Sequence, residues 1–230
     1  MRRESTSTRL ARDVHAHIPP ADEVRSIISL PPEHRAIWEL AAPHLAVRNN
    51  DSHTLYAYGI ARALVARIAL RDAGLDAEVA LCAILLHDTG WSTVRSDEIL
   101  EAIAPGGGRP DLVRRHEIEG ARIAREILTS LDHPPERVAR VAEIIDGHDS
   151  RPYALTLEDA IVKDADKIWR VTPHGRGIVC GWFSLTPEES LRITAARVED
   201  ALFTDEGRAM AAAFIAAASI DLAPERAGLV

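Results

Sequence analysis

A histidine and an aspartate stand side by side at the end of an otherwise almost entirely apolar run, as His87 and Asp88 in the segment AILLHDTGWS. The apolar residues around them predict a buried position. A carboxylate in an apolar setting takes up a proton unless a cation or hydrogen-bond donors satisfy its charge. The pair therefore indicates a buried site in which a cation or several donors meet Asp88.

Three further histidines and a second aspartate continue apolar rows with helical spacing. On the helix predicted for residues 51–74, His53 shares one face with Ala57 and Ile60. The same pattern places other polar residues inward near the ends of different helices, namely His116, His148 and Asp164. One metal site would satisfy all of these side chains at once. Imidazole and carboxylate suit manganese, iron, cobalt, nickel or zinc, and the lack of thiolates argues against a structural zinc site.

Helical periodicity dominates the chain and no strand-like alternation of any length appears, which predicts an all-α fold. The helix that ends at HDTG is apolar nearly all round, so we expect it at the centre. Gly120 lies in a helix interior, where glycine costs about 1 kcal/mol relative to alanine, and it indicates a close helix contact. Two glycine-containing stretches, 104–111 and 172–187, are expected to be connections. The predicted helices cover approximately residues 31–47, 51–74, 76–90, 116–131, 134–148, 155–171, 187–203 and 205–219.

The composition is that of an ordinary globular chain, with 47% hydrophobic and 27% charged residues among 230. The formal net charge of -8 argues against an extended nucleic acid as partner, because that normally needs a basic face. Cys82 and Cys180 lie far apart, which fits a reducing compartment. Because we find neither a signal-peptide segment nor an apolar run that could span a bilayer, we expect a cytoplasmic protein without membrane contact. One domain is expected over residues 31–220, between a lead-in (1–30) and a tail (221–230).

The order of the candidate ligands resembles that of the HD-domain superfamily of metal-dependent phosphohydrolases. The resemblance covers roughly residues 50–170 and rests on His53, the adjacent pair His87 and Asp88, and Asp164 in VKDADK. Two intervening histidines, His116 in HEIEGARIA and His148 in IIDGHD, look like the additional ligands of the dinuclear branch.

This resemblance implies an HD-domain-like helical bundle with a metal site between its helices. It also implies divalent transition-metal ions, two per chain, from among manganese, iron, cobalt, nickel and zinc. The first ion would be held by His53, His87, Asp88 and Asp164. The second would be held by His116 and His148, with Asp88 bridging both.

The implied activity is hydrolysis of a phosphate ester, from a nucleotide or another small phosphorylated metabolite, by a metal-activated water. Asp88 would be catalytic, because it could bridge the ions and also orient the nucleophile. The charged substrate would need cationic partners near the metals. Candidates for this role are Lys167, His174 and Arg176, together with Arg114 and Arg115 beside His116.

Trp91 stands where some dinuclear relatives carry a substrate-contacting lysine, three positions after the aspartate. This departure argues against a cyclic-dinucleotide phosphodiesterase, and we expect Trp91 either to stack on a base or to wall the pocket. Two alternative functions use the same six ligands. One is a dinuclear iron oxygenase that cleaves a C–C or C–P bond, and the other is a non-catalytic metal-binding domain.

Overall fold

The computed structural model describes residues 14–20, 23–24 and 29–228, which fall into two units, Met1–Pro31 and Pro32–Val230. The described part of the first unit contains a short helical turn, in which the backbone N–H of His17 donates to the carbonyl of Val14 at 3.0 Å. Most of the expected lead-in lies outside the described residues.

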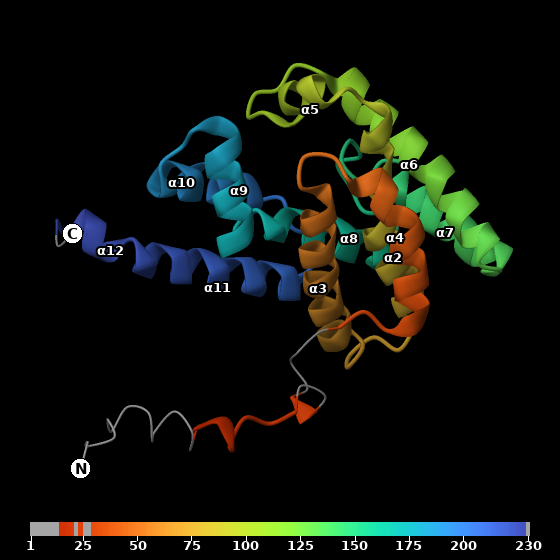
Figure 1. Ribbon diagram of the computed structural model, residues 1–230, viewed down its shortest axis with the longest axis horizontal. Helices are drawn as coiled ribbons and strands as arrows, with labels where there is room; N and C mark the ends of the chain where they lie inside the picture. Colours follow the sequence, from red (N-terminus) through yellow and green to blue (C-terminus); the bar gives the residue numbers. More distant parts are fainter. Residues whose placement is uncertain (1–13, 21–22, 25–28, 229–230) are drawn as a thin grey trace, which may run out of the picture. The chain divides into compact units, whose positions relative to one another are not determined.

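The second unit is all-helical, as the periodicity predicts, and its described residues contain no strand (Figure 1). A short 3-10 helix, η2 (Thr89–Thr93), begins within the HDTG segment, directly after Asp88. The α-helices are α2 (Pro32–Leu45), α3 (Asn50–Ile68), α4 (Ala77–Leu86), α5 (Ser96–Ile103), α6 (Pro110–Ser130), α7 (Pro135–Ile145), α8 (Leu157–Trp169), α9 (Pro173–Phe183), α10 (Pro187–Val198), α11 (Asp205–Asp221) and α12 (Ala223–Arg226).

The stretch 172–187, expected as a connection, is largely helix α9. Thr172 begins this helix, because its Oγ1 accepts a hydrogen bond from the backbone N–H of Gly175 at 3.1 Å. Pro173 follows at the first helical position, where its missing N–H costs nothing. Gly175 is also required for packing, since a Cβ there would collide with the carbonyl of Trp169. The start signals and the close packing therefore outweigh the low helix propensity of glycine.

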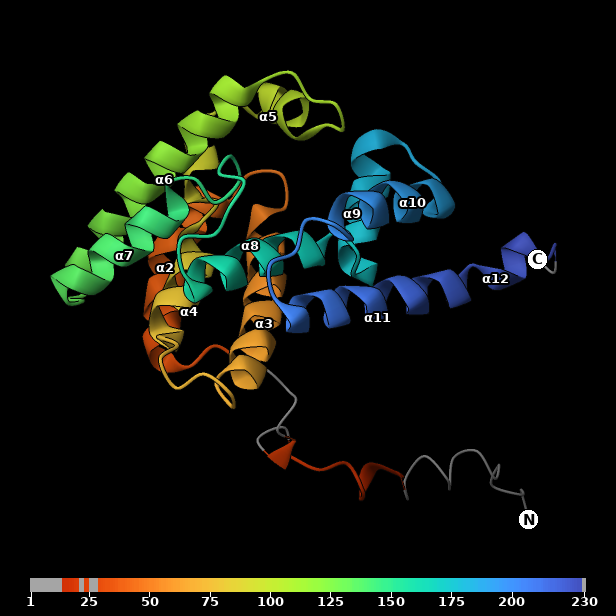
Figure 2. The same cartoon turned by 180° about the vertical axis from the view of Figure 1, so that it is seen from behind.

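Helix α4 forms the centre of the unit, as predicted. Its residues from Val79 to Leu86 are all buried, and it packs against α3, α7 and α8. In both ribbon views α6 and α7 lie on one side of this core, and α9, α10 and α11 lie on the other (Figures 1 and 2). Helix α8, which runs between the two sides, is buried around nearly its whole circumference.

Two glycines bring the segment after α4 against α6. A Cβ on Gly120 would lie 3.1 Å from the carbonyl oxygen of His87, which confirms the expected close contact. A Cβ on Gly90 would collide with the backbone carbonyl of His116. The HD segment and His116 are therefore in backbone contact.

None of the helices in the described part of the chain is both long and apolar enough to cross a membrane.

Candidate metal centre

Four histidines and Asp88 meet in the core, each from a different helix or helix end except for the adjacent pair. His53 of α3 and His87 at the end of α4 approach with their Nε2 atoms 3.2 Å apart. On the other side, the Nε2 atoms of His116 and His148 are 3.4 Å apart. The carboxylate of Asp88 lies between the two pairs, with one oxygen 3.3 Å from His53 Nε2 and the other 3.6 Å from His148 Nε2. The structure thus brings together five of the six predicted ligands.

The hydrogen bonds of two histidines fix which ring nitrogen faces the cluster. Nδ1 of His87 donates to the carbonyl oxygen of Ile84 at 2.8 Å, and Nδ1 of His148 donates to that of Ile145 at 2.9 Å. A carbonyl can only accept, so these nitrogens carry the protons of the neutral rings. Each Nε2 then presents a lone pair to the cluster, which is the arrangement of a metal-ligating histidine.

Buried acceptors therefore face one another, and a positive charge between them would satisfy them. Burial alone lowers the pKa of His53, but hydrogen bonds to Asp166 and Asp88 overcome it and raise the pKa to about 9. His148 behaves alike, since Asp88 and Asp149 outweigh its burial and raise the pKa to about 9. Without metal, protons supply the positive charge. Lone-pair nitrogens and carboxylates in this arrangement fit divalent transition-metal ions.

Asp164 does not face this cluster, and Asp166 occupies the place predicted for it. The Asp164 carboxylate accepts hydrogen bonds from the backbone N–H groups of Phe203 and Thr204 at 2.8 and 2.9 Å, and from Thr204 Oγ1 at 2.7 Å. Asp166 Oδ1 lies 3.3 Å from His53 Nε2. Two residues along a helix correspond to a rotation of about 200°, so the two carboxylates point in nearly opposite directions. The candidate ligand from α8 is therefore corrected to Asp166.

Asp149 is a further candidate ligand that the helical pattern did not indicate. Its Oδ2 lies 3.5 Å from His116 Nε2 and 3.9 Å from His148 Nε2. Three groups of closely spaced ligand atoms result: His53, His87 and Asp166; His87, Asp88 and His148; and His116, His148 and Asp149. The signal in the sequence was the dipeptide His148-Asp149, which repeats the His-Asp adjacency of the central pair.

The family comparison agrees with this geometry. The family described as the HD domain matches residues 50–170, which is more than half of the chain. The chain belongs to the HD-domain family. This family consists in general of metal-dependent phosphohydrolases. Neither the curated proteins nor the solved structures contain a match to the chain.

In this HD domain Trp91 positions two of the clustered side chains. Its indole Nε1 donates to Asp88 Oδ1 at 3.2 Å. Its ring is stacked on His116, with centroids 3.9 Å apart and planes inclined by 9°. Trp91 also lines the cleft at this centre. Of the two roles expected for it, stacking on a base or forming a wall of the pocket, the structure supports the second.

A buried network holds the loop that carries His148 of the HD domain. Lys163 Nζ donates to the carbonyl oxygens of Gly147 and His148, both at 2.8 Å, and to that of Arg151 at 3.0 Å. From the other side, the Glu117 carboxylate accepts bonds from the backbone N–H groups of residues 149 and 150 at 2.9 and 2.7 Å. Both polar anchors are almost fully buried. These bonds fix the backbone on both sides of His148, and the bond from its Nδ1 to Ile145 orients the ring.

The three residues predicted to bind substrate do not line the cleft at the HD centre. Lys167 Nζ points to the carbonyl of its own helix neighbour Lys163, at 3.4 Å. His174 is stacked on Tyr56 at 3.9 Å and accepts a hydrogen bond from an indole. Arg176 Nε is buried on α9 without a hydrogen-bond partner in the described part of the chain. Arg114 forms an ion pair with Asp146 instead.

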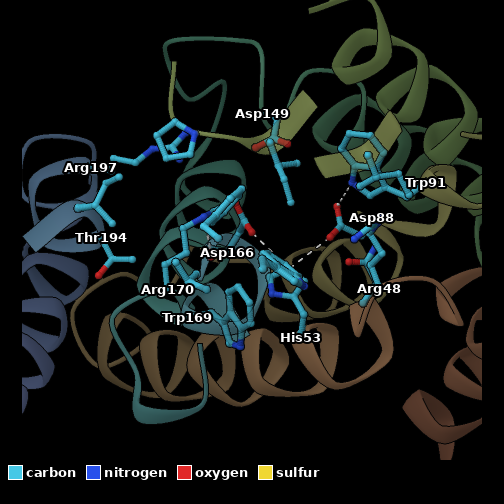
Figure 3. Close-up of a pocket in the computed structure, with 18 residues that line it drawn as sticks. Arg48, His53, Asp88, Trp91, Asp149, Asp166, Trp169, Arg170, Thr194 and Arg197 are labelled. Atoms are coloured by element: carbon cyan, nitrogen blue, oxygen red, sulfur yellow. Dashed lines mark hydrogen bonds and ion pairs between the residues drawn. The ribbon is translucent and has the colours of Figure 1, made fainter. Parts of the chain in front are cut away.

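The HD centre lies at the base of a cleft of about 760 Å³, measured with its open mouth. His53, Asp88, Asp149 and Asp166 of the cluster line the cleft. Figure 3 shows Asp88 and Trp91 on one side of it and Thr194 and Arg197 on the other. Its cationic lining residues are Arg48, Arg170 and Arg197, none of which was a sequence-based candidate.

Proposed function

We propose that this HD-domain protein is a metal-dependent hydrolase of a small phosphate ester. The observation that carries the proposal is the combination, in one cleft, of a buried imidazole–carboxylate cluster with three arginines. Imidazole and carboxylate atoms suit transition-metal ions, and arginines suit a phosphoryl group. Neither feature alone would indicate this chemistry.

Two ligand sets that share Asp88 support a dinuclear centre. One set would consist of His53, His87, Asp88 and Asp166, and the other of His116, His148, Asp149 and Asp88. Divalent ions bound there would polarise the phosphoryl oxygens and lower the pKa of a nearby water. Trp91 fixes Asp88 through its indole N–H, so this carboxylate is held in one orientation between the two sets.

The arginines of the cleft would neutralise the charge of the phosphoryl group. Arg170 is held by an ion pair with Asp166 at 3.1 Å, next to the cluster. Arg197 has no hydrogen-bond or ion-pair partner among the residues that the structure describes, and burial followed by repulsion from Arg170 lowers the pKa of its guanidinium. An anionic group that enters the cleft would relieve this repulsion. The lining of the cleft therefore indicates the negative charge of the substrate more clearly than any other property of the substrate.

Asn50 offers the cleft a further hydrogen-bond donor. It begins α3, one turn before His53, and lines the cleft. Its side chain is buried, and Nδ2 has no hydrogen-bond partner in the described part of the chain. An unsatisfied buried donor is costly, whereas a phosphoryl oxygen would satisfy it. We therefore assign Asn50 to substrate binding.

Phosphate release by protein of known metal content tests the proposal. The protein is purified without oxygen, its metals are measured, and small phosphate monoesters are supplied under argon with manganese, iron, cobalt, nickel or zinc. We expect about two ions per chain and phosphate release that a chelator abolishes. The His87→Ala/Asp88→Ala variant should lose both.

The control for this test is the oxygen requirement. Turnover that needs dioxygen and iron would overturn the hydrolase and favour C–C or C–P bond cleavage. A folded protein that binds no metal and turns over no ester would support a non-catalytic domain.

A further inference from the structure

The cleft has a second wall that lies outside the segment matched by the HD family. This distal wall is formed by Val179, Trp182 and Phe183 of α9 and by Ile193, Thr194 and Arg197 of α10. The family match ends at residue 170, before either helix begins. Figure 3 places Thr194 and Arg197 across the cleft from Asp88 and Trp91. The distal wall is therefore a feature of this chain rather than of the matched motif.

Local interactions hold the two helices of the distal wall. Helix α9 ends directly after Phe183, at Ser184, whose φ of 53° turns the chain out of the helix. Helix α10 begins with a capping box, in which Thr186 Oγ1 accepts from the N–H of Glu189 at 3.3 Å and Glu189 accepts from the N–H of Thr186 at 2.9 Å. Ser190 Oγ then donates to a carbonyl of α9 at 3.1 Å. These bonds hold α9 and α10 in a fixed arrangement in the distal wall.

The distal wall is apolar except at one end. Trp182 and Phe183 are half-buried, and Trp182 continues toward Trp169 with ring centroids 6.1 Å apart. Val179 and Ile193 lie beside them in the cleft. The hydroxyl of Thr194 donates within its own helix, at 2.6 Å. Among the residues that the structure describes, the guanidinium of Arg197 and the indole N–H of Trp182 are the distal-wall donors without a hydrogen-bond partner.

Beside Val179, Phe183 and Ile193, a hydroxyl-rich group would lose its hydration without gaining hydrogen bonds, and this loss is unfavourable. An apolar group would instead remove aromatic surface from water, which is favourable. The metal cluster, Arg48 and Arg170 lie outside the distal wall and suit a phosphoryl group. The two sides therefore fit different parts of one molecule.

We propose that the distal wall is a binding subsite for an aromatic or similarly bulky apolar group of the substrate, carried on the phosphate ester that the metal centre hydrolyses. This inference rests on the proposed function for the position of the phosphoryl group. It predicts selection against esters of polyols and sugars. Trp182 and Phe183 are its specificity-determining residues.

Two phosphonates that cannot be hydrolysed test the subsite by binding alone. Phenylphosphonate and methylphosphonate carry the same charged group and differ in the apolar part. We expect the manganese-loaded protein to bind phenylphosphonate about 10- to 100-fold more tightly, as isothermal titration calorimetry would measure. Equal affinities, or no measurable binding of either compound, would overturn the proposal.

Alanine variants locate the preference on the wall. Trp182→Ala and Phe183→Ala should each reduce the preference for phenylphosphonate several-fold and leave the affinity for methylphosphonate unchanged. Trp38→Ala is the matched control, because Trp38 is half-buried on α2 outside the cleft. A preference that survives both wall variants would overturn the assignment. Selective binding without hydrolysis of phenyl phosphate would leave the subsite in place and overturn the proposed hydrolase.

Discussion

Asp164 and Asp166 show how two identical side chains on one helix take different tasks. Both are buried on α8. Asp164 accepts three hydrogen bonds from the segment before α11, and Asp166 lies beside His53 in the cluster. A stripe of apolar residues cannot distinguish them, because α8 is buried on almost every side. The donors at residues 203 and 204, which are far away in sequence, decide which of the two carboxylates points away from the cluster.

Matched Asp→Asn substitutions separate the two tasks. Asp166→Asn should weaken metal binding by more than about 100-fold, since loss of even an outer partner of a ligand costs about 10- to 100-fold. Asp164→Asn should keep the metal, but its amide group would face N–H donors and lower the free energy of unfolding by about 1 to 3 kcal/mol. Metal titration and urea unfolding of both variants measure the two effects. Metal loss in Asp164→Asn with unchanged stability would contradict the assignment.

The arginines of the cleft could not be identified from residue types alone. The chain has 27 lysines and arginines, and nothing in their local sequence distinguishes Arg48 or Arg197 from a solvated residue. Their role depends on which helices meet at the cleft. The histidines, by contrast, could be found because polar residues inside apolar rows are conspicuous.

At the scale of elements, the approach of η2 to α6 sets the position of His116. This approach needs glycine at position 90, because a Cβ there would collide with the carbonyl of His116. Gly120 of α6 completes the contact from the other side. The sequence indicated this contact through Gly120, whereas helix α9 was missed because its glycines resemble those of a connection.

Gly90→Ala should therefore destabilise the protein by about 1 to 3 kcal/mol, as overpacking of a close contact does. Because the added methyl group pushes against His116, the variant should also bind less metal. Gly59→Ala is the control, since a Cβ on Gly59 of α3 meets nothing within 4 Å. That substitution should stabilise the helix by up to about 1 kcal/mol. Thermal unfolding and metal content of both variants check this, and equal behaviour would refute the contact argument.

For the whole molecule, the cluster couples folding to metal and to pH. The pKa values of His53 and His148 are raised to about 9 in the metal-free fold, against about 6.5 in an unfolded chain. The folded state therefore binds more protons, and the stabilisation is complete below pH 6.5 and is lost as pH rises toward 9.

Metal-free protein should lose of the order of a few kcal/mol of unfolding free energy between pH 6.5 and 8. Above that pH the trend should weaken, because burial lowers the pKa of Lys163 to about 8. Metal-loaded protein should bind its ions more tightly as pH rises, since protons compete for the same nitrogens. Urea unfolding with and without a chelator at several pH values measures both trends. A metal-free stability that rises from pH 6.5 to 8 would contradict them.

The all-helical fold, the central helix and most of the cluster follow from periodicity and from polar residues in apolar rows. The cleft does not, because it forms where α5, α8, α9 and α10 meet and each contributes residues that are ordinary in their own segment. Such tertiary features depend on packing between distant parts of the chain.

The hydrogen bonds of Asp164 show that the family motif and the autonomous folding unit of this chain differ in length. The motif ends at residue 170, but the donors to Asp164 come from Phe203 and Thr204. A fragment cut at the motif boundary would retain every candidate metal ligand. It would also leave a carboxylate in its interior without donors, on the helix that carries Asp166. We therefore expect the smallest piece of this chain that folds by itself to reach at least to Thr204, directly before α11.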